Sequence, residues 1–438
     1  MIGGGTFPLA YAQEGVPAPQ IGPPAPPGFE SLGALSLEMA VRRAVEWNPS
    51  IEEAVARIGA DEAEVRVARA GYYPTIRGGV GTQYDNRLRN TAWLPRPQIS
   101  VSQMIVDFGK VSSDVAAARA GVDISRAQML LAVDSLVRDT AQVVVEIQRH
   151  EALLAVADAQ LESVLAINTL VQHRTRNGAS TRSDAVQAEA RVEAARVSVL
   201  EIRGQLERWR GVLSYLIGSK APVTAVRSEA PAWLDQMCEG PEPNWTQVPT
   251  IQEASARREE AIARLHRSRA DALPTLSLDA GAAADLRDPI SSSSNYNFGL
   301  SLSSSLFQGG ASKARRAGAE QSLRAANAAV EASNLAAERA LAEARQQIPS
   351  LRQRRASLGV REAMMRETGK LYRLQYLEMG TRTLIDLLNA EQELHQVLFD
   401  GVNAEHDLRR LGLDCMFNKG QSRDRFALNG MRVRGVTL

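Results

Sequence analysis

The sequence has few aromatic residues, almost no net charge and no long apolar run, and each shortage excludes a class of protein. Phe, Trp and Tyr make up only 5% of the 438 residues, which is little for a chain that would build several compact cores. Lys and Arg number 51 against 50 Asp and Glu, so no basic field indicates nucleic-acid binding. No run of 18 apolar residues occurs, which argues against a transmembrane helix. A place in a membrane would therefore require a closed β-barrel.

Enzyme and metal-site signatures are missing too. The two cysteines, Cys238 and Cys415, lie in no CxxC or CxxH spacing, and their even count leaves open one disulfide or two unrelated thiols. His395 and His406 would lie about 16 Å apart along a helix, too far to share a metal, and we expect both on a solvated surface. No GxGxxG, P-loop or GxSxG motif lies between a strand and a helix. We therefore expect no enzyme, no cofactor and no metal, and energy must come from a partner protein.

The first 35 residues are expected to lie outside the folded units. Residues 1–12 end in Ala10-Tyr11-Ala12, the small-x-small pattern of a signal-peptidase site, and are interpreted as a signal-peptide remnant. The alternative is a disordered soluble N-terminus. Residues 13–35 are rich in proline and predict an extended linker. No cysteine follows the expected cleavage site, so we expect no N-terminal lipid.

The rest of the chain consists of two tandem copies of one unit. Residues 49–54 (PSIEEA) match residues 249–254 (PTIQEA), 200 positions further on. Proline, glycine and aspartate occur in the same order in both copies, and the number of positions between matching residues changes only from 200 to 202. The matching pairs are Pro49 and Pro249, Pro74 and Pro274, Gly178 and Gly380, and Asp184 and Asp386. Chance similarity between two Ala- and Glu-rich helices would not keep that order, so the sequence predicts a tandem duplication.

Each copy is predicted to contain one helix, two strands and a long helical hairpin. We expect helices over 36–71, 111–176 and 178–217, and again over 248–272, 312–378 and 382–412. At about 1.5 Å per residue the longest would span about 100 Å and must pack laterally as a coiled coil. The domains are then a first repeat at 36–218, an inter-repeat linker at 219–246, a second repeat at 247–413 and a C-terminal tail at 414–438.

Between the helices, apolar and polar residues alternate over segments of about ten residues, as in membrane barrels. The clearest segments hold Leu276, Leu278, Ala280 and Ala282, and then Phe298, Leu300 and Leu302. Aromatic residues near the strand ends predict an interfacial girdle, with plain core residues as the alternative; they are Tyr72, Tyr73, Phe108, Tyr296 and Phe298. The four strands of one chain cannot close a barrel, but three chains together supply twelve strands, an even number in the range of outer-membrane barrels. Another number of chains remains the alternative.

The span from about 36 to 420 resembles the TolC outer-membrane efflux proteins. The resemblance is carried by the Asn48-Pro49 break, by Tyr73-Pro74-Thr75, by Phe307-Gln308-Gly309-Gly310 and above all by residues 380–390 (GTRTLIDLLNA). It implies an α+β membrane protein: a trimeric 12-stranded outer-membrane β-barrel, four strands per chain, continued by an α-helical coiled-coil tunnel in the periplasm of a Gram-negative bacterium. The partners implied are two further copies of the chain, outer-membrane lipid, a periplasmic membrane-fusion (adaptor) protein and an inner-membrane pump.

The same resemblance places the channel constriction just inside the periplasmic turns at Gly178 and Gly380. Asp386 falls on the position of an acidic ring, and a second acidic position is filled by Asn389. Three carboxylates in a ring would attract cations and raise one another's pKa.

A gate latch is implied beside that ring. Arg382 matches a basic latch residue, and Asp184 with Ser183 matches its partners on the neighbouring turn. The aromatic latch position falls on Leu377, beside Tyr376. The alternative is that these are ordinary turn-capping and helix-surface charges.

The sequence leaves several alternatives for the pump that this duct would serve. The tail from Asp414 to Val436 is similar to that of outer-membrane components of type I exporters for large adhesins, which predicts type I protein secretion through an ABC exporter. A channel for a multidrug efflux pump is the alternative. A coiled-coil scaffold outside any membrane is an alternative of another class, but it would have no use for amphipathic strands.

The implied fold also brings the cysteines together. By the 202-residue separation, Cys415 corresponds to Leu213, at the end of the returning helix of the first copy. In this fold the linker that contains Cys238 and the C-terminal tail should both wrap the tunnel at mid-height. We therefore predict a Cys238–Cys415 disulfide, since the periplasm would oxidise two thiols held within bonding range.

Overall fold

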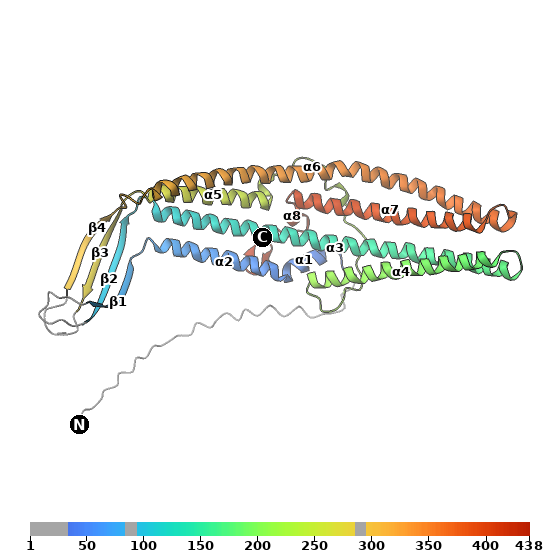
Figure 1. The fold of residues 1–438 in the computed structure, drawn as a ribbon, viewed down its shortest axis with the longest axis horizontal. Helices are drawn as coiled ribbons and strands as arrows, with labels where there is room; N and C mark the ends of the chain where they lie inside the picture. The colour runs from blue at the N-terminus through green and yellow to red at the C-terminus, as the bar shows by residue number, and fades with distance from the viewer. Residues whose placement is uncertain (1–33, 84–93, 285–294) are drawn as a thin grey trace, which may run out of the picture.

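A computed structural model describes residues 34–83, 94–284 and 295–438, which form a long bundle of helices with a sheet at one end (Figure 1). The first copy contains α1 (Leu37–Trp47), α2 (Pro49–Ala70), β1 (Thr75–Gln83), β2 (Leu94–Val106), α3 (Lys110–Arg176) and α4 (Arg182–Leu216). The second contains α5 (Pro249–Ala270), β3 (Thr275–Ala283), β4 (Asn295–Ser303), α6 (Ala311–Leu374), the π-helical turn η3 (Gln375–Met379) and α7 (Leu384–Asn418). The expected signal-peptide remnant and nearly all of the proline-rich linker lie outside the described residues.

Prolines set where the first helix of each copy begins. Asn48 separates α1 from α2, and its side chain accepts a hydrogen bond from the backbone N–H of Ser50 at 3.0 Å. Pro49 then occupies the first helical position, where a missing N–H costs nothing. In the second copy Pro249 begins α5 in the same way, but only a 3₁₀ turn, η2 (Trp245–Gln247), precedes it. The second copy therefore lacks a counterpart of α1 among the described residues.

The four strands form one antiparallel sheet in the order β1-β2-β3-β4. Their register puts one type of side chain on each face: Ile76 pairs with Val101, Val101 with Ala280, and Ala280 with Phe298. The neighbouring row joins Thr75, Ser102, Asp279 and Gly299. One face is thus mainly apolar and the other mainly polar, as expected for a membrane barrel wall. The exceptions are Gln103, opposite Leu278, and Met104, opposite Ser277, next to an irregularity in the register of β2. β1 and β4 remain as the two edges, which four strands cannot join.

The predicted aromatic residues of the strand ends are exposed in the protomer. Tyr73 is 69% exposed and Phe298 77%, and Tyr72, Phe108 and Tyr296 are also exposed. They are therefore not core residues of the protomer, which agrees with a girdle that faces lipid.

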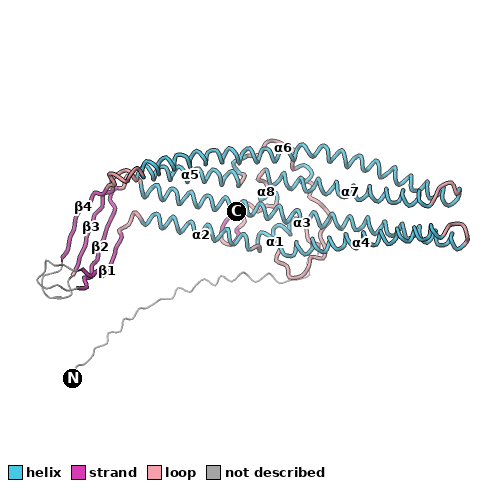
Figure 2. Tube along the Cα trace, in the orientation of Figure 1, coloured by secondary structure: helices cyan, strands magenta, loops and turns pink. Residues whose placement is uncertain are grey.

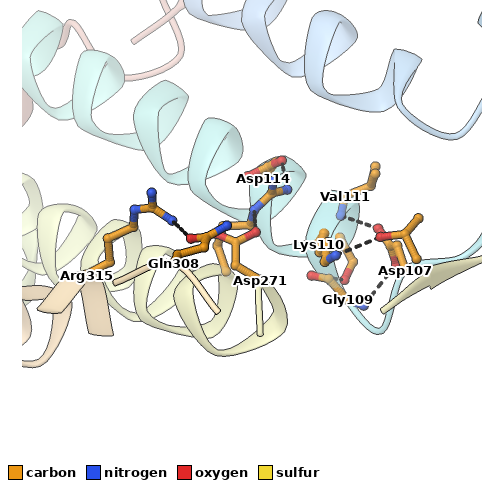
Figure 3. A network of polar contacts seen from close by, with 11 residues as sticks. Asp107, Gly109, Lys110, Val111, Asp114, Asp271, Gln308 and Arg315 are labelled. Atoms are coloured by element: carbon orange, nitrogen blue, oxygen red, sulfur yellow. Dashed lines mark hydrogen bonds and ion pairs between the residues drawn. The ribbon is translucent and has the colours of Figure 1, made fainter. Parts of the chain in front are cut away.

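Asp107 joins the sheet to the helices at the start of α3 (Figure 3). Its carboxylate accepts hydrogen bonds from the backbone N–H groups of Gly109, at 2.9 Å, and Val111, at 2.5 Å. These N–H groups have no partner within the helix, and a negative charge is favourable at a helix N-terminus. A network beside it links Arg267 of α5 to Asp114 of α3 and to Asp271.

The 67-residue α3 is the central element of the protomer, and it packs on α1, α2, α4, α5, α7 and the short α8 (Ser422–Arg425). Within the described residues, α3 contains a stretch apolar enough to cross a membrane by length and composition, with mean hydropathy 1.3. The sequence contains no uninterrupted run of 18 apolar residues, and the absence of a transmembrane helix stays a prediction. A single helix of this kind is weak evidence of a span, because a helix that packs on several neighbours has the same composition.

At mid-height, short segments wrap the helices and build the largest apolar core (Figure 2). Residue 35 pairs with residue 226 in a parallel bridge, so the N-terminal segment and the inter-repeat linker run side by side. The 3₁₀ turn η1 (Leu234–Gln236), α8 and a two-stranded ribbon of β5 (Arg432–Val433) and β6 (Val436–Thr437) complete this layer, which we call the belt. The belt lies between the sheet and the hairpin turns, as predicted.

The linker is attached to the last turns of α7. Cys238 and Cys415 form a disulfide with a Cα–Cα distance of 5.1 Å, and the Leu234 backbone lies against Gly412, where a Cβ would meet its carbonyl oxygen at 2.4 Å. Cys415 lies inside α7, because that helix continues to Asn418 rather than ending near 412. The boundary drawn between residues 413 and 414 therefore falls within a helix.

Candidate functional site

Two helical turns lie together at the end of the molecule farthest from the sheet (Figure 1). Gly178, between α3 and α4, and Gly380, between η3 and α7, both adopt the left-handed backbone conformation, with φ of +71° and +62°. Glycine takes this conformation without the steric cost that other residues carry. The duplication thus places the same reversal of direction at the tip of both hairpins.

The residue after each turn is held by the same capping box. Thr181 caps α4 with Asp184 as its partner, and Thr383 caps α7 with Asp386. The Asp386 carboxylate accepts hydrogen bonds from the backbone N–H of Thr383 at 3.1 Å and from its hydroxyl at 2.9 Å. The Asp184 carboxylate accepts one from the backbone N–H of Thr181 at 2.9 Å. Both carboxylates therefore stabilise a helix N-terminus.

These hydrogen bonds also fix the charge of Asp386. The backbone N–H of Thr383, and then its hydroxyl, lower the pKa of the Asp386 carboxyl below its ordinary value. A rise in pKa from repulsion between carboxylates was expected, and within one protomer the direction is the opposite. Asp386 stays half-exposed, and Asn389 is exposed one turn further along α7. The charge is consequently fixed, ionised and accessible.

Arg382 lies in the turn of the second hairpin, after η3 and before α7. Its Nε donates to Gln375 at 3.3 Å, its guanidinium carbon lies 4.4 Å from the centre of the Tyr372 ring, and an Nη lies 4.0 Å from Asp386. Within the part of the chain that the structure describes, Arg382 makes no ion pair with Asp184 in the same protomer. The exposed Ser183 lies beside Asp184 on the other turn.

Tyr376 connects the two turns, although its sequence position beside Leu377 did not predict this role. The Tyr376 hydroxyl lies 3.3 Å from the Ser180 hydroxyl, and its ring is buried with the Arg174 guanidinium 4.9 Å from the ring centre. It belongs to an apolar cluster that joins both hairpins, with Ile167, Val171, Ala185, Ala188, Leu384, Leu387 and Leu388. The π-helical turn η3, which sets Tyr376 inward, had no sequence signal that we recognised.

Two histidines of α7 correct another expectation. His395 and His406 are both buried, each 4% exposed, rather than solvated. His395 lies 3.0 Å from a Glu391 oxygen, and His406 lies 2.8 Å from the Val402 carbonyl oxygen, so each has a partner one turn earlier. Burial is the main cause that lowers the pKa of His406. The two rings serve the packing of α7.

Comparison with known proteins agrees with this geometry. The family described as outer membrane efflux protein matches residues 40–219 and 246–410, which are the two repeats. The protein CyaE of Bordetella pertussis is 26% identical over 332 residues, covering 72% of this chain and 69% of CyaE. Nodulation protein T of Rhizobium leguminosarum bv. viciae is 24% identical over 170 residues, covering 38% of this chain and 35% of that protein.

Solved structures share the fold. The outer membrane protein VceC of Vibrio cholerae superposes with a TM-score of 0.77 at 19% identity, covering 88% of this chain and 96% of VceC. A membrane protein of Pseudomonas aeruginosa gives 0.78 at 22% identity, covering 92% and 96%. With a matching sheet, helical hairpins and paired turns, this chain belongs to the outer membrane efflux protein family, the TolC-like channels of the Gram-negative outer membrane that serve tripartite export systems.

Proposed function

We propose that the chain forms a homotrimeric exit duct for type I protein secretion, which docks on a periplasmic adaptor and an inner-membrane ABC exporter. The observation that carries the proposal is the pair of capped turns, tied by Tyr376 and Ser180 at the far end from the sheet. A duct that opens only when its partners engage needs a closable end, and the hairpin tips form the end nearest those partners. The duct itself is passive.

The constriction is a ring of three Asp386 carboxylates, one from each protomer. Thr383 holds each carboxylate at the start of α7 and keeps it ionised. Asn389 adds no charge, so one ring rather than two attracts cations. The latch is an ion pair between Arg382 and Asp184 of adjoining hairpins, with Ser183 beside it. Both Arg382 and Asp184 face solvent in the protomer, which leaves them accessible to a neighbour.

The choice of protein secretion rests on the C-terminal tail. The tail resembles that of large-adhesin type I exporters, and it forms part of the belt. Arg434 anchors it through an ion pair with Glu52 at 2.6 Å and a hydrogen bond to the Trp47 carbonyl oxygen at 3.1 Å. Deleting the gene should remove a large exported protein from the cell surface or medium and leave drug susceptibility unchanged. The reverse pattern would assign the duct to a drug pump.

The ring is tested by planar-bilayer conductance of the purified channel. Multivalent cations added from the side of the hairpin tips should block the wild type. Asp386→Ala should raise the half-blocking concentration by about tenfold, equivalent to about 1.4 kcal/mol of lost attraction. Asn389→Ala is the matched control one turn away and should leave the block unchanged. Equal effects of both substitutions, or none from either, would contradict a single acidic ring.

A further inference from the structure

A basic groove lies between α2 and α3, just below the sheet. Its volume is about 500 Å³, and it is lined by Glu62, Val65, Arg66, Arg69, Arg119, Val122, Asp123 and Arg126. The two valines are buried and form an apolar floor, while the arginines are exposed. Four guanidinium groups therefore surround an apolar surface with only two carboxylates between them.

One arginine uses both of those carboxylates. Arg126 lies 3.4 Å from Glu62 and 3.7 Å from Asp123. Among the residues that the structure describes, Arg66, Arg69 and Arg119 form no ion pair and no side-chain hydrogen bond. The groove thus has three positive charges without a partner among the described residues, in a chain whose net charge is +1.

The groove opens on the lipid-facing side of the wall. At the start of α3 the Lys110 ammonium donates to the Thr275 hydroxyl at 2.7 Å, and Thr275 lies on the polar face of the sheet, four residues before Asp279 on β3. Lys110 therefore lies on the lumen side of α3. Arg119 follows nine residues later, a rotation of about 180° on a helix of about 3.6 residues per turn. It consequently lies on the opposite side, the side of the apolar sheet face.

The height of the groove matches the headgroup layer of the membrane. Arg69 precedes the exposed Tyr72 by one helical turn, which is about 5 Å along the axis. The headgroup layer beyond the hydrocarbon core is itself roughly 5–8 Å thick on each side, and Tyr residues mark its level. Side chains lean toward the N-terminus of their helix, so Arg119 of α3 leans toward the sheet and Arg66 of α2 leans toward Arg119. All three arginines line the one groove, directly below the expected level of the membrane surface.

We propose that this groove binds the phosphate groups of an anionic phospholipid in the periplasmic leaflet of the outer membrane. Guanidinium groups hold phosphate oxygens through paired hydrogen bonds, which a single ammonium does not provide. The apolar floor of Val65 and Val122 accepts the glycerol and the first methylenes of the lipid. The groove lies between α2 and α3 of one protomer, so each subunit of the channel has its own site. A lipid bound there would fix the height of the subunit relative to the bilayer.

The test is native mass spectrometry of the purified channel in a neutral detergent, titrated with cardiolipin or with phosphatidylcholine. The wild type should retain cardiolipin and not phosphatidylcholine. The triple variant R66Q/R69Q/R119Q should bind cardiolipin about 100-fold more weakly, because each basic residue at an anionic surface contributes roughly a fivefold change. The control R203Q/R354Q/R361Q removes three exposed arginines far from the sheet, with the same change in charge, and should bind like the wild type.

Each other outcome decides against the groove. Equal losses in both triple variants would show attraction by overall charge, and no loss in the groove variant would show that the lipid binds elsewhere. Displacement of the lipid by millimolar inorganic phosphate would indicate a free-anion site. If the triple variant does not assemble, Arg69→Gln alone should show about a fivefold loss. Conductance and cation block should stay as in the wild type, so this test is independent of the proposed gate.

Discussion

Asp134, on α3 at the level of the belt, is a charged group enclosed by protein. Its side chain is 1% exposed; one carboxylate oxygen accepts from the Nε of Arg423 at 3.1 Å, and the other has no hydrogen-bond partner in the described structure. Burial raises the pKa of this carboxyl from 3.8 to about 6, although the Arg423 guanidinium lowers it. The ion pair with the tail therefore offsets only part of the cost of burial.

This raised pKa gives a pH dependence of stability with a defined sign. The folded state holds this proton more tightly than the unfolded state, so the contribution of Asp134 to the free energy of unfolding should increase as pH falls from about 6 toward 3.8. Asp134→Asn should abolish this gain, which is about 3 kcal/mol at most for a shift of about two units. Thermal unfolding of the two proteins at several pH values between 4 and 7 measures the difference. Asp158→Asn, on an exposed position of the same helix, should keep the wild-type profile.

Two glycines of α7 make a matched pair for testing the contact with the linker. A Cβ on Gly412 would come within 2.4 Å of the Leu234 carbonyl oxygen, whereas a Cβ on Gly401 would meet nothing within 4 Å. Gly412→Ala should therefore destabilise the protein by about 1–3 kcal/mol. Gly401→Ala should stabilise it by up to about 1 kcal/mol, because alanine favours the helix. Thermal unfolding of both variants in detergent decides, and a neutral Gly412→Ala would show that the linker moves aside freely.

Single residues were predictable where the sequence repeats a turn, and less so where packing decides. Gly178 and Gly380, and the aspartates after them, stand out because two copies keep them in place. The capping role of Asp386 was readable from Thr383 three residues earlier, and we held it as the alternative. The burial of His395 and His406 was not readable, because α7 is covered on more than one side and its apolar stripe does not show which positions are enclosed.

At the scale of elements, the two hairpins are joined by the buried Tyr376 ring and its apolar cluster, while each cap stabilises the helix of its own hairpin. The intact contact between Tyr376 and Ser180 holds them within a protomer, so any latch between protomers acts in addition to it. Separating the hairpins of one protomer from those of the next should then require the loss of the charges of Arg382 and Asp184, and not of the contact between Tyr376 and Ser180.

The latch prediction follows from that division. Arg382→Ser, combined with Asp184→Ala, should raise single-channel conductance, because both charges that would tie adjoining hairpins are removed. The caps keep part of their stabilisation, since Thr181 and Thr383 remain. Bilayer recordings measure the effect, and Arg361→Ser, an exposed position on α6 outside the turn, is the control. Wild-type conductance in the double variant would mean that packing alone keeps the tips closed.

Helix ends were predicted well where glycine or proline marks them. Gly178 and Pro249 did so, and α3 begins and ends within a residue of the expected range. The end of α7 was missed by six residues, because the chain there continues as a helix under the belt and no glycine or proline stops it before Gly420. The π-helical turn η3 was also missed, since an inserted residue in a helix leaves no mark in a single sequence.

At the scale of the whole molecule, the parts have separate tasks. The sheet supplies an apolar wall, the hairpin tips form the end that we propose to be closable, and the belt binds the helices between them. The duplication, together with the change from helical to alternating periodicity in each copy, predicted that each copy supplies one half of the wall and one hairpin. It did not predict the belt in detail, since the N-terminal segment, the linker and the tail are the segments that do not repeat.

The disulfide between linker and α7 should stabilise the belt without affecting the gate. It closes a loop of 177 residues, for which the chain-entropy account gives about 5 kcal/mol. Residual structure in the unfolded chain would make the measured stabilisation smaller. Cys238→Ser with Cys415→Ser should lower the unfolding temperature of the channel, while conductance and cation block stay at wild-type values, because the bond lies at mid-height and the proposed ring lies at the tips. Non-reducing peptide mass spectrometry of protein isolated from the cell envelope should show one linked pair, and two freely alkylated thiols would contradict the bond.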